Sequence, residues 1–131
     1  MVVADRHGFP IAIGIASGER HETQLVLTTL DARFVKPLPQ RLVGDRAYDS
    51  DGLAAQVKQW GVQMIAPSNP TRTTKTQDGR PLRGYRRRWH VERLFAWFMH
   101  FRRLVTRYEI KAENFLGLVQ LACVLILLRR L

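Results

Sequence analysis

The sequence predicts an α/β fold in which helices flank a mixed β-sheet. Three observations predict it. The chain opens with two β-branched segments around a turn, alternates helix and strand patterns up to residue 67, and ends with two long helical patterns. The resulting order is β-β-α-β-α-β-loop-α-α, and such an order is typical of helices and sheet packed in layers around one core.

The first two strands are predicted at residues 2–5 (VVAD) and 11–18 (IAIGIASG). They should form a hairpin, because the stretch 5-DRHGFP-10 between them contains the Gly and Pro of a turn. Residues 21–34 carry apolar side chains at helical spacing after a polar start, which predicts a helix. The short apolar segment 41-RLVGD-45 predicts a buried strand that ends on an aspartate.

A second helix is predicted over residues 51–61, with Asp51 as its N-terminal cap and Gly61 as its stop. The segment 62-VQMIAP-67 predicts another buried strand. A polar, basic loop should follow at residues 68–84, since this stretch contains two prolines and clusters of Thr with Lys or Arg.

Two helices are predicted at the end of the chain, over about 85–106 and 113–128, so that residues 85–131 form a C-terminal helical part. A chain of 131 residues has the length of one domain, and we predict a single domain without internal repeats. The hydrophobic content of 46% excludes a globally disordered protein.

The net charge of +10 points to a polyanionic partner, and nucleic acid is the first candidate. Between Arg72 and Lys111 the chain has twelve Lys or Arg and three acids, so nine of the ten net charges lie there. A solvated surface normally carries charges of both signs. A cluster of positive charges suits phosphate, to which the guanidinium of arginine donates two parallel hydrogen bonds. We therefore predict a DNA-binding surface in this region.

Other classes of protein are disfavoured by the composition. The lone Cys123 excludes an internal disulfide and a Cys-based zinc site, and its apolar setting predicts an inert core residue. The longest apolar run, 116–128, is shorter than a bilayer requires, and the N-terminus lacks the pattern of a signal peptide. We expect a cytoplasmic protein that has no membrane partner.

The helix predicted over 85–106 places Glu92 beside an apolar stripe. Tyr85 and Arg88 precede Glu92 at spacings that put the three side chains on one face, at the margin of the core. The stripe that should face the core consists of Val91, Leu94, Phe95, Phe98, Phe101 and Val105. From the residues alone, Glu92 is either the partner of Arg88 in an ion pair at i, i+4 or a functional carboxylate.

A functional Glu92 would need a second carboxylate, and Asp45 is the strongest candidate because it ends a predicted strand. Asp49 and Asp51 are alternatives that lie in a turn and a helix cap, where a structural role is favoured. Two converging carboxylates would suit Mg²⁺, which keeps several waters and binds substrate phosphate.

These residues resemble the DDE transposases of bacterial insertion sequences, in particular the insertion-sequence-four/five group. Its helix signature is Tyr, two residues, Arg, three residues, Glu, six residues, Lys, and Tyr85, Arg88 and Glu92 match it. The stretch 43-VGDRAYDSDGL-53 resembles the second-aspartate motif of the group. The N-terminal hairpin and the closing helix, 114-NFLGLVQLACVLILL-128, resemble the group as well.

The resemblance implies a ribonuclease H-like fold and metal-dependent cleavage of transposon-end DNA, followed by strand transfer into target DNA. Asp45 and Glu92 would be its second and third metal-binding, catalytic acids, with Mg²⁺ or Mn²⁺ as the cofactor. DNA contacts are expected from Tyr85, Arg86, Arg87, Arg88, Arg93, Arg102, Arg103 and Arg107. A second copy of the chain, or a full-length transposase, would be its protein partner.

Two departures from the group affect this expectation. Met99 replaces the signature lysine, which removes a phosphate contact. The first catalytic aspartate of the group has no counterpart, because Asp5 falls in the hairpin turn. We therefore expect an N-terminally truncated, partial catalytic domain without the first strand, which binds metal weakly and is incomplete or inactive alone.

Two other functions remain open. The first is a non-catalytic DNA-binding fragment that modulates a full-length transposase, for which binding would depend on salt and not on Mg²⁺. The second is a basic RNA-binding protein. The aromatic residues of the Glu92 helix disfavour it, because they fall mainly on the stripe predicted to face the core and not on an exposed stacking platform.

Overall fold

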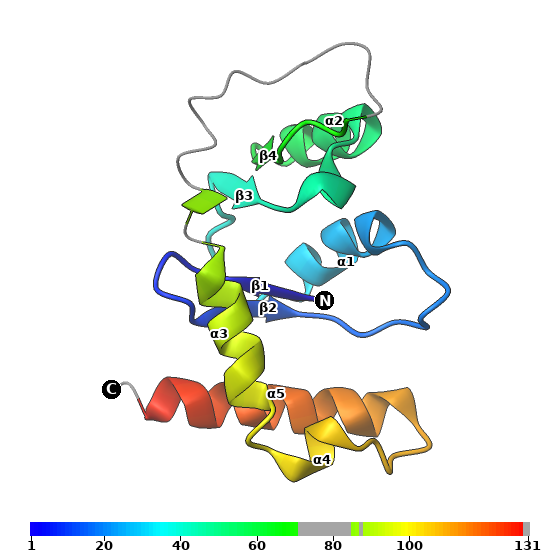
Figure 1. Ribbon diagram of the computed structural model, residues 1–131, viewed down its shortest axis with the longest axis vertical. Coiled ribbons are helices and arrows are strands. Elements are labelled where there is room, and N and C mark those ends of the chain that lie inside the picture. Colours follow the sequence, from blue (N-terminus) through cyan, green and yellow to red (C-terminus); the bar gives the residue numbers. More distant parts are fainter. Residues whose placement is uncertain (71–84, 87, 130–131) are drawn as a thin grey trace.

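The computed structural model describes residues 1–70, 85–86 and 88–129, and it has two small sheets surrounded by helices (Figure 1). Strand β1 (Val2–Ala4) pairs antiparallel with β2 (Pro10–Ile13), and β3 (Arg41–Val43) pairs parallel with β4 (Gln63–Ile65). Both pairings occur, but within these residues they form two separate two-stranded sheets. The predicted α/β class is confirmed at this level.

The β1–β2 hairpin confirms the predicted turn. Gly8 has a φ of +86°, which a residue with a side chain rarely adopts, and Asp5 stabilises the turn from within. One oxygen of Asp5, Oδ1, accepts hydrogen bonds from the backbone N of His7 at 2.8 Å and of Phe9 at 2.9 Å. Asp5 therefore has the role of a turn residue, as its place in the sequence predicted.

The helix predicted over 21–34 is shorter and begins with a 3₁₀ turn. The turn η1 (Glu22–Leu25) leads into α1 (Val26–Asp31), which buries Val26 and Leu30. Three β-branched residues in α1, Val26, Thr28 and Thr29, lower its intrinsic helix propensity, so packing has to hold it.

Helix α2 (Asp51–Gln59) confirms the predicted second helix but not its cap. Ser50 is the N-cap, and its Oγ accepts a hydrogen bond from the backbone N of Leu53 at 3.4 Å. The prediction of Asp51 as the cap was therefore wrong by one residue. Gly61 ends the helix as predicted, because its φ of +74° lets the chain turn into β4.

Where the structure describes it, the C-terminal part has three α-helices, whereas two helices were predicted. These are α3 (Trp89–Phe98), α4 (Arg102–Val105) and α5 (Ala112–Leu128). The helix predicted over 85–106 breaks after Phe98, and the extended backbone of Phe101 separates α4 from α3. Because of this break, α5 and α4 lie at one end of α3, and β3 lies near the other end (Figure 1).

The break also changes which residues face the core. Leu94 and Phe98 of the predicted stripe are buried, whereas Phe95 is 51% exposed and Val105 is 55% exposed. The stripe was predicted for one straight helix; it fails at Val105, beyond the break, and also at Phe95, which lies within α3 itself. Among the described residues, no helix is both long and apolar enough to cross a membrane.

Two hydrophobic clusters hold these elements. The first lies among β1, β2, α1, α2 and the β3–β4 sheet, and the second joins α3, α5 and the hairpin through Leu94, Phe98 and Ile13. Cys123 belongs to the second cluster, and burial raises the pKa of its thiol to about 11. A thiol buried in this way stays protonated at neutral pH, which agrees with the predicted inert core residue.

Candidate functional site

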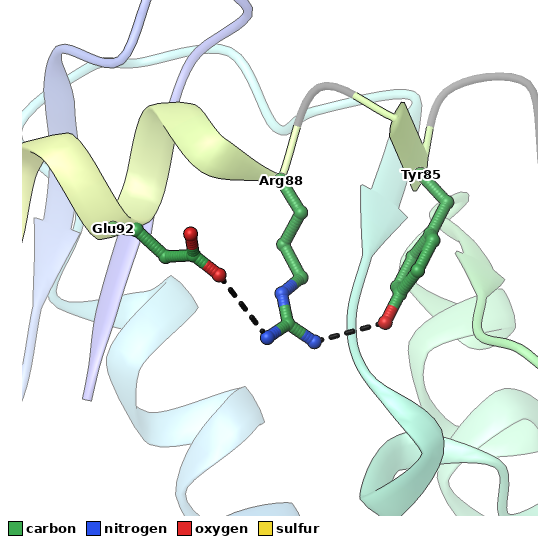
Figure 2. Close-up of polar contacts among 3 residues, drawn as sticks. All are labelled: Tyr85, Arg88 and Glu92. Carbon is green, nitrogen blue, oxygen red and sulfur yellow. Dashed lines mark hydrogen bonds and ion pairs between the residues drawn. The ribbon is translucent and has the colours of Figure 1, made fainter.

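Tyr85, Arg88 and Glu92 form one connected row at the start of α3 (Figure 2). The Arg88 guanidinium lies between the other two side chains. Its Nη1 donates a hydrogen bond to the Tyr85 hydroxyl at 2.9 Å, and its Nη2 donates one to Glu92 Oε1 at 3.2 Å. The structure therefore brings together the three residues that the spacing of the sequence placed on one face.

Glu92 lies farther from the core than predicted. Its side chain is 65% exposed, and that of Arg88 is 41% exposed. The reason is the direction of α3, which turns Leu94 into the core and leaves Glu92 on the solvent side. The prediction that Glu92 occupies the margin of the core was wrong.

The ion pair between Arg88 and Glu92 has the i, i+4 geometry of an ordinary surface pair. The hydrogen bond to Glu92 raises the pKa of Arg88, which stays charged. Pairs this exposed stabilise a helix by only about 0.5 kcal/mol or less, so stability gives little reason for this arrangement. Glu92 also lies in the first turn of α3, where the helix dipole favours a negative charge.

Asp45 follows strand β3 and begins the 3₁₀ turn η2 (Arg46–Tyr48). Its Oδ1 accepts a hydrogen bond from the backbone N of Ala47 at 2.9 Å. In Figure 1 the start of α3 is the end of that helix nearer to β3, whereas the helix itself packs mainly on β1 and α5. Within the described residues, no hydrogen bond or ion pair joins Asp45 to Glu92.

Tyr48, for which no role was predicted from the sequence, joins the turn that begins with Asp45 to the 3₁₀ turn η1. Its hydroxyl donates a hydrogen bond to Glu22 Oε2 in η1 at 3.1 Å. Its ring packs so closely on Gly44 that a Cβ there would lie 2.8 Å from a ring carbon. Burial first, and then the charges of Glu22 and Asp45, raise the pKa of Tyr48.

Replacing Tyr48 with phenylalanine is expected to lower the free energy of unfolding by about 1 kcal/mol, because the ring remains while the bond to Glu22 is lost. Between pH 7 and alkaline pH, the free energy of unfolding should also fall less in the variant than in the wild type. The raised pKa of Tyr48 means that the unfolded chain ionises first above about pH 10, so this group lowers wild-type stability there.

Urea denaturation at pH 7 and at alkaline pH measures both effects. Tyr108→Phe is the matched control, because Tyr108 is 74% exposed. Equal stability of Tyr48→Phe and the wild type at pH 7 would show that the hydroxyl contributes nothing to holding the turn of Asp45.

The alternative acids Asp49 and Asp51 have structural surroundings. Asp49 Oδ2 accepts a hydrogen bond from the backbone N of Asn69 at 2.7 Å, which ties the turn before α2 to the segment after β4. Asp51 lies in the first turn of α2. These positions favour the structural reading for both residues.

The basic residues predicted to bind DNA fall into two groups. Arg86 and Arg88 lie just before α3, whereas Arg102 and Arg103 lie in α4, beyond the other end of α3. Arg107 follows α4 and donates hydrogen bonds to the backbone oxygens of two nearby residues, at 2.9 and 3.2 Å. Arg87 and most of the predicted basic loop at 68–84 lie outside the described residues.

Among the described arginines that were predicted to bind DNA, Arg93 differs from the others because it is partly buried against protein groups. It stacks between Trp89 and Trp97 and bonds to the hairpin turn. Arg93 was predicted from its charge to contact DNA. The spacing of Trp89, Arg93 and Trp97, four residues apart on one helix face, was the available signal for this other role.

The oxygen chemistry of Asp45 and Glu92 fits a hard cation such as Mg²⁺. Each carboxylate uses one oxygen in the protein contacts given above, Oδ1 of Asp45 and Oε1 of Glu92. Among the described residues, however, no group of three or more His, Cys, Asp or Glu side chains is placed to hold a metal ion. Carboxylate oxygens are therefore the right type of ligand for Mg²⁺, but two carboxylates supply only a few of the ligands that the ion needs.

Comparison with known proteins supports the resemblance. A family model described as the transposase DDE domain matches residues 1–127. A Burkholderia cepacia protein named as a transposase for insertion sequence element IS402 is 29% identical over 135 residues. The match covers 95% of this chain and 60% of the relative, so the chain spans less than two thirds of that protein. No solved structure matches the chain.

Proposed function

This chain belongs to the transposase DDE domain family, and on that premise we propose that it acts in DNA transposition, through metal-dependent cleavage of DNA and strand transfer. The observation that carries the proposal is the connected row of Tyr85, Arg88 and Glu92 at the start of α3. The proposed site of action is DNA in the bacterial cytoplasm, including the nucleoid.

In the proposed site, Asp45 and Glu92 hold Mg²⁺. When bound, the ion would supply charge stabilisation for the scissile phosphate and help to deprotonate the attacking water or 3′-hydroxyl. The other residues of the site act on these two carboxylates. The bond from Arg88 fixes the Glu92 side chain, and the bond between Tyr48 and Glu22 holds the turn that begins with Asp45.

The proposed DNA surface consists of arginines before and after α3. Arg86, Arg102 and Arg103 are exposed, and a guanidinium in this state can donate a bidentate pair of hydrogen bonds to a phosphate. Such contacts position the DNA backbone without reading its sequence. We propose Arg88 as the link between this surface and the catalytic acids, because it already contacts Glu92.

A second candidate function is that of a DNA-binding segment without catalysis. The exposed ion pair of Glu92 favours it, since Arg88 occupies one oxygen that a metal ion would need. Both candidates predict DNA binding, and only the first predicts cleavage that requires Mg²⁺. A second copy of the chain or a longer transposase is the protein partner expected in either case.

DNA binding tests the basic surface directly. Fluorescence anisotropy of a labelled duplex should show that the logarithm of the affinity falls linearly with the logarithm of the salt concentration. Arg102→Gln should reduce the size of that slope by about one. Arg33→Gln is the matched control, because the Arg33 guanidinium already donates to the backbone oxygens of Leu30 and Lys36. Equal slopes for Arg102→Gln and the wild type would remove Arg102 from the proposed surface.

Nicking of supercoiled plasmid with and without Mg²⁺ separates the two candidate functions. Nicking that requires the metal supports the catalytic proposal. Salt-dependent binding without nicking by this chain alone fits both the DNA-binding segment and a catalytic domain that lacks its first acid, and cleavage by a longer transposase that contains this chain then decides between the two. A chain that shows neither binding nor nicking would contradict both.

A further inference from the structure

Arg93 contacts the hairpin turn, which is remote in the sequence. Its Nη2 donates a hydrogen bond to the backbone oxygen of His7 at 2.7 Å, across 86 residues of chain, and lies 3.1 Å from Nδ1 of His90. The bond is charge-assisted, because a backbone oxygen accepts it from a permanently charged guanidinium. It joins α3 to the turn between β1 and β2.

Two indole rings hold the guanidinium in place. The Arg93 Cζ atom lies 4.7 Å from the ring centroid of Trp89 and 5.0 Å from that of Trp97. Rings at these distances attract a cation through their quadrupoles. Trp89 also stacks on the ring of His90, with the ring centroids 3.9 Å apart. The Arg93 side chain is therefore fixed in one orientation along α3.

Two of the three guanidinium nitrogens of Arg93 are enclosed or already engaged. Its Nε is buried and has no hydrogen-bond partner among the residues that the structure describes, and its Nη2 is already used. An arginine that grips DNA presents an exposed fork with two free donors. The geometry of Arg93 is that of a group turned toward its own protein.

The hairpin turn is shaped to receive this side chain. A Cβ on Gly8 would lie 3.1 Å from Arg93 Nη2, 3.2 Å from the backbone oxygen of His90 and 3.3 Å from the His90 Cβ. The positive φ of Gly8 and the absence of a side chain let the turn approach the first turn of α3. Turn and helix thus meet at Gly8, His90 and Arg93.

We propose that Arg93 is a positioning residue that clasps the β1–β2 turn to α3 and so sets the orientation of the neighbouring Glu92. The inference rests on the proposed function in one respect, the role of Glu92 as a catalytic acid. It gives Arg93 a task different from the phosphate contact expected from its charge. The hairpin, rather than the DNA, is the partner of its guanidinium.

DNA binding distinguishes the two tasks of Arg93. Arg93→Gln should leave the slope of log affinity against log salt unchanged, while Arg102→Gln reduces it by about one. If nicking is observed for the wild type, Arg93→Gln should lower kcat and leave the KM for DNA unchanged within about twofold. A reduced salt slope for Arg93→Gln would overturn the inference in favour of a phosphate contact.

Amide hydrogen exchange on the free chain tests the clasp without any activity. In Arg93→Gln the amides of His7, Gly8 and Phe9 should exchange about tenfold faster, the change expected on losing one charged hydrogen bond. Arg93→Lys should restore part of the protection, because it keeps the charge and one donor. Gly8→Ala should loosen the same turn from the other side.

The control is again Arg33→Gln, which removes a guanidinium bonded to backbone oxygens outside the clasp and should not change exchange at residues 7–9. Unchanged exchange in Arg93→Gln would overturn the clasp. The proposed function can fail separately: a wild-type chain that neither binds nor nicks DNA contradicts it, while exchange at the turn still decides the clasp.

Discussion

Replacing Glu92 with glutamine, in this chain or in a longer transposase that contains it, is expected to lower the rate of Mg²⁺-dependent plasmid nicking by more than about a hundredfold, as is replacing Asp45 with asparagine. An amide keeps the shape of each side chain and removes the negative charge that would hold the metal ion. Loss of a residue that only orients a metal ligand costs about 10- to 100-fold, so loss of a ligand should cost at least as much.

The loss of nicking should occur without unfolding. Glu92 is exposed and its pair with Arg88 is a surface pair, so urea denaturation should show a change of about 0.5 kcal/mol or less for Glu92→Gln. Glu113→Gln is the matched control, because Glu113 is an exposed acid in the first turn of α5. It should nick like the wild type.

Glu92→Gln and Asp45→Asn are read separately. If one of the variants nicks at the wild-type rate, the residue replaced in it is not a metal ligand, and the ligand would have to be another carboxylate. If Glu113→Gln lost as much activity as Glu92→Gln, the effect would come from the overall charge and not from the site.

The largest expected effect on stability is that of Leu94→Ala, at about 3 kcal/mol. Leu94 is fully buried and lies in the hydrophobic cluster that joins α3, α5 and the hairpin. Removing its branched side chain loses the transfer free energy of the buried carbons and leaves a cavity where the three elements meet. Urea denaturation followed by circular dichroism measures the loss.

Phe95→Ala is the control for Leu94→Ala. Phe95 is the next residue of the same helix and is 51% exposed, so its replacement should cost clearly less, despite the larger volume removed. Equal losses for the two variants would mean that Phe95 packs as deeply as Leu94, and the orientation assigned to α3 would then be wrong.

Elements whose boundaries depend on local chemistry were predictable from the sequence. The hairpin turn at residues 5–10 and the stop at Gly61 both need a positive φ, and glycine stands at both places. The two strands before Asp45 and Pro67 were recognisable as short apolar runs, and α5 by its long one.

The break after Phe98 was not predictable in the same way, because no glycine or proline marks it. The apolar spacing continues through Phe101 and Val105, which favours one long helix. What competes with this local preference is tertiary packing, since Leu104 and Phe101 pack with α5 in the second cluster. A pattern within one helix does not contain that information.

For the candidate site, the sequence predicted neighbours within a helix and failed on burial. The row of Tyr85, Arg88 and Glu92 follows from spacings of three and four residues. The exposure of Glu92 and the enclosure of Arg93 depend on where the hairpin packs, and a contact between residues 7 and 93 has no local signature. The pairing of Asp45 with Glu92 stays a prediction.

The two arginine groups lie beyond opposite ends of α3, so the length of this helix contributes to the distance between them. Ten helical residues span about 15 Å, so α3 alone separates the backbone before Trp89 from the backbone after Phe98 by about that length. Along the axis of B-DNA, where the phosphates of one strand recur about every 3.4 Å, about 15 Å corresponds to four or five phosphates. A duplex that touches both groups would therefore present a footprint whose minimum length is set by the protein backbone, and lengthening α3 by one turn would lengthen that footprint.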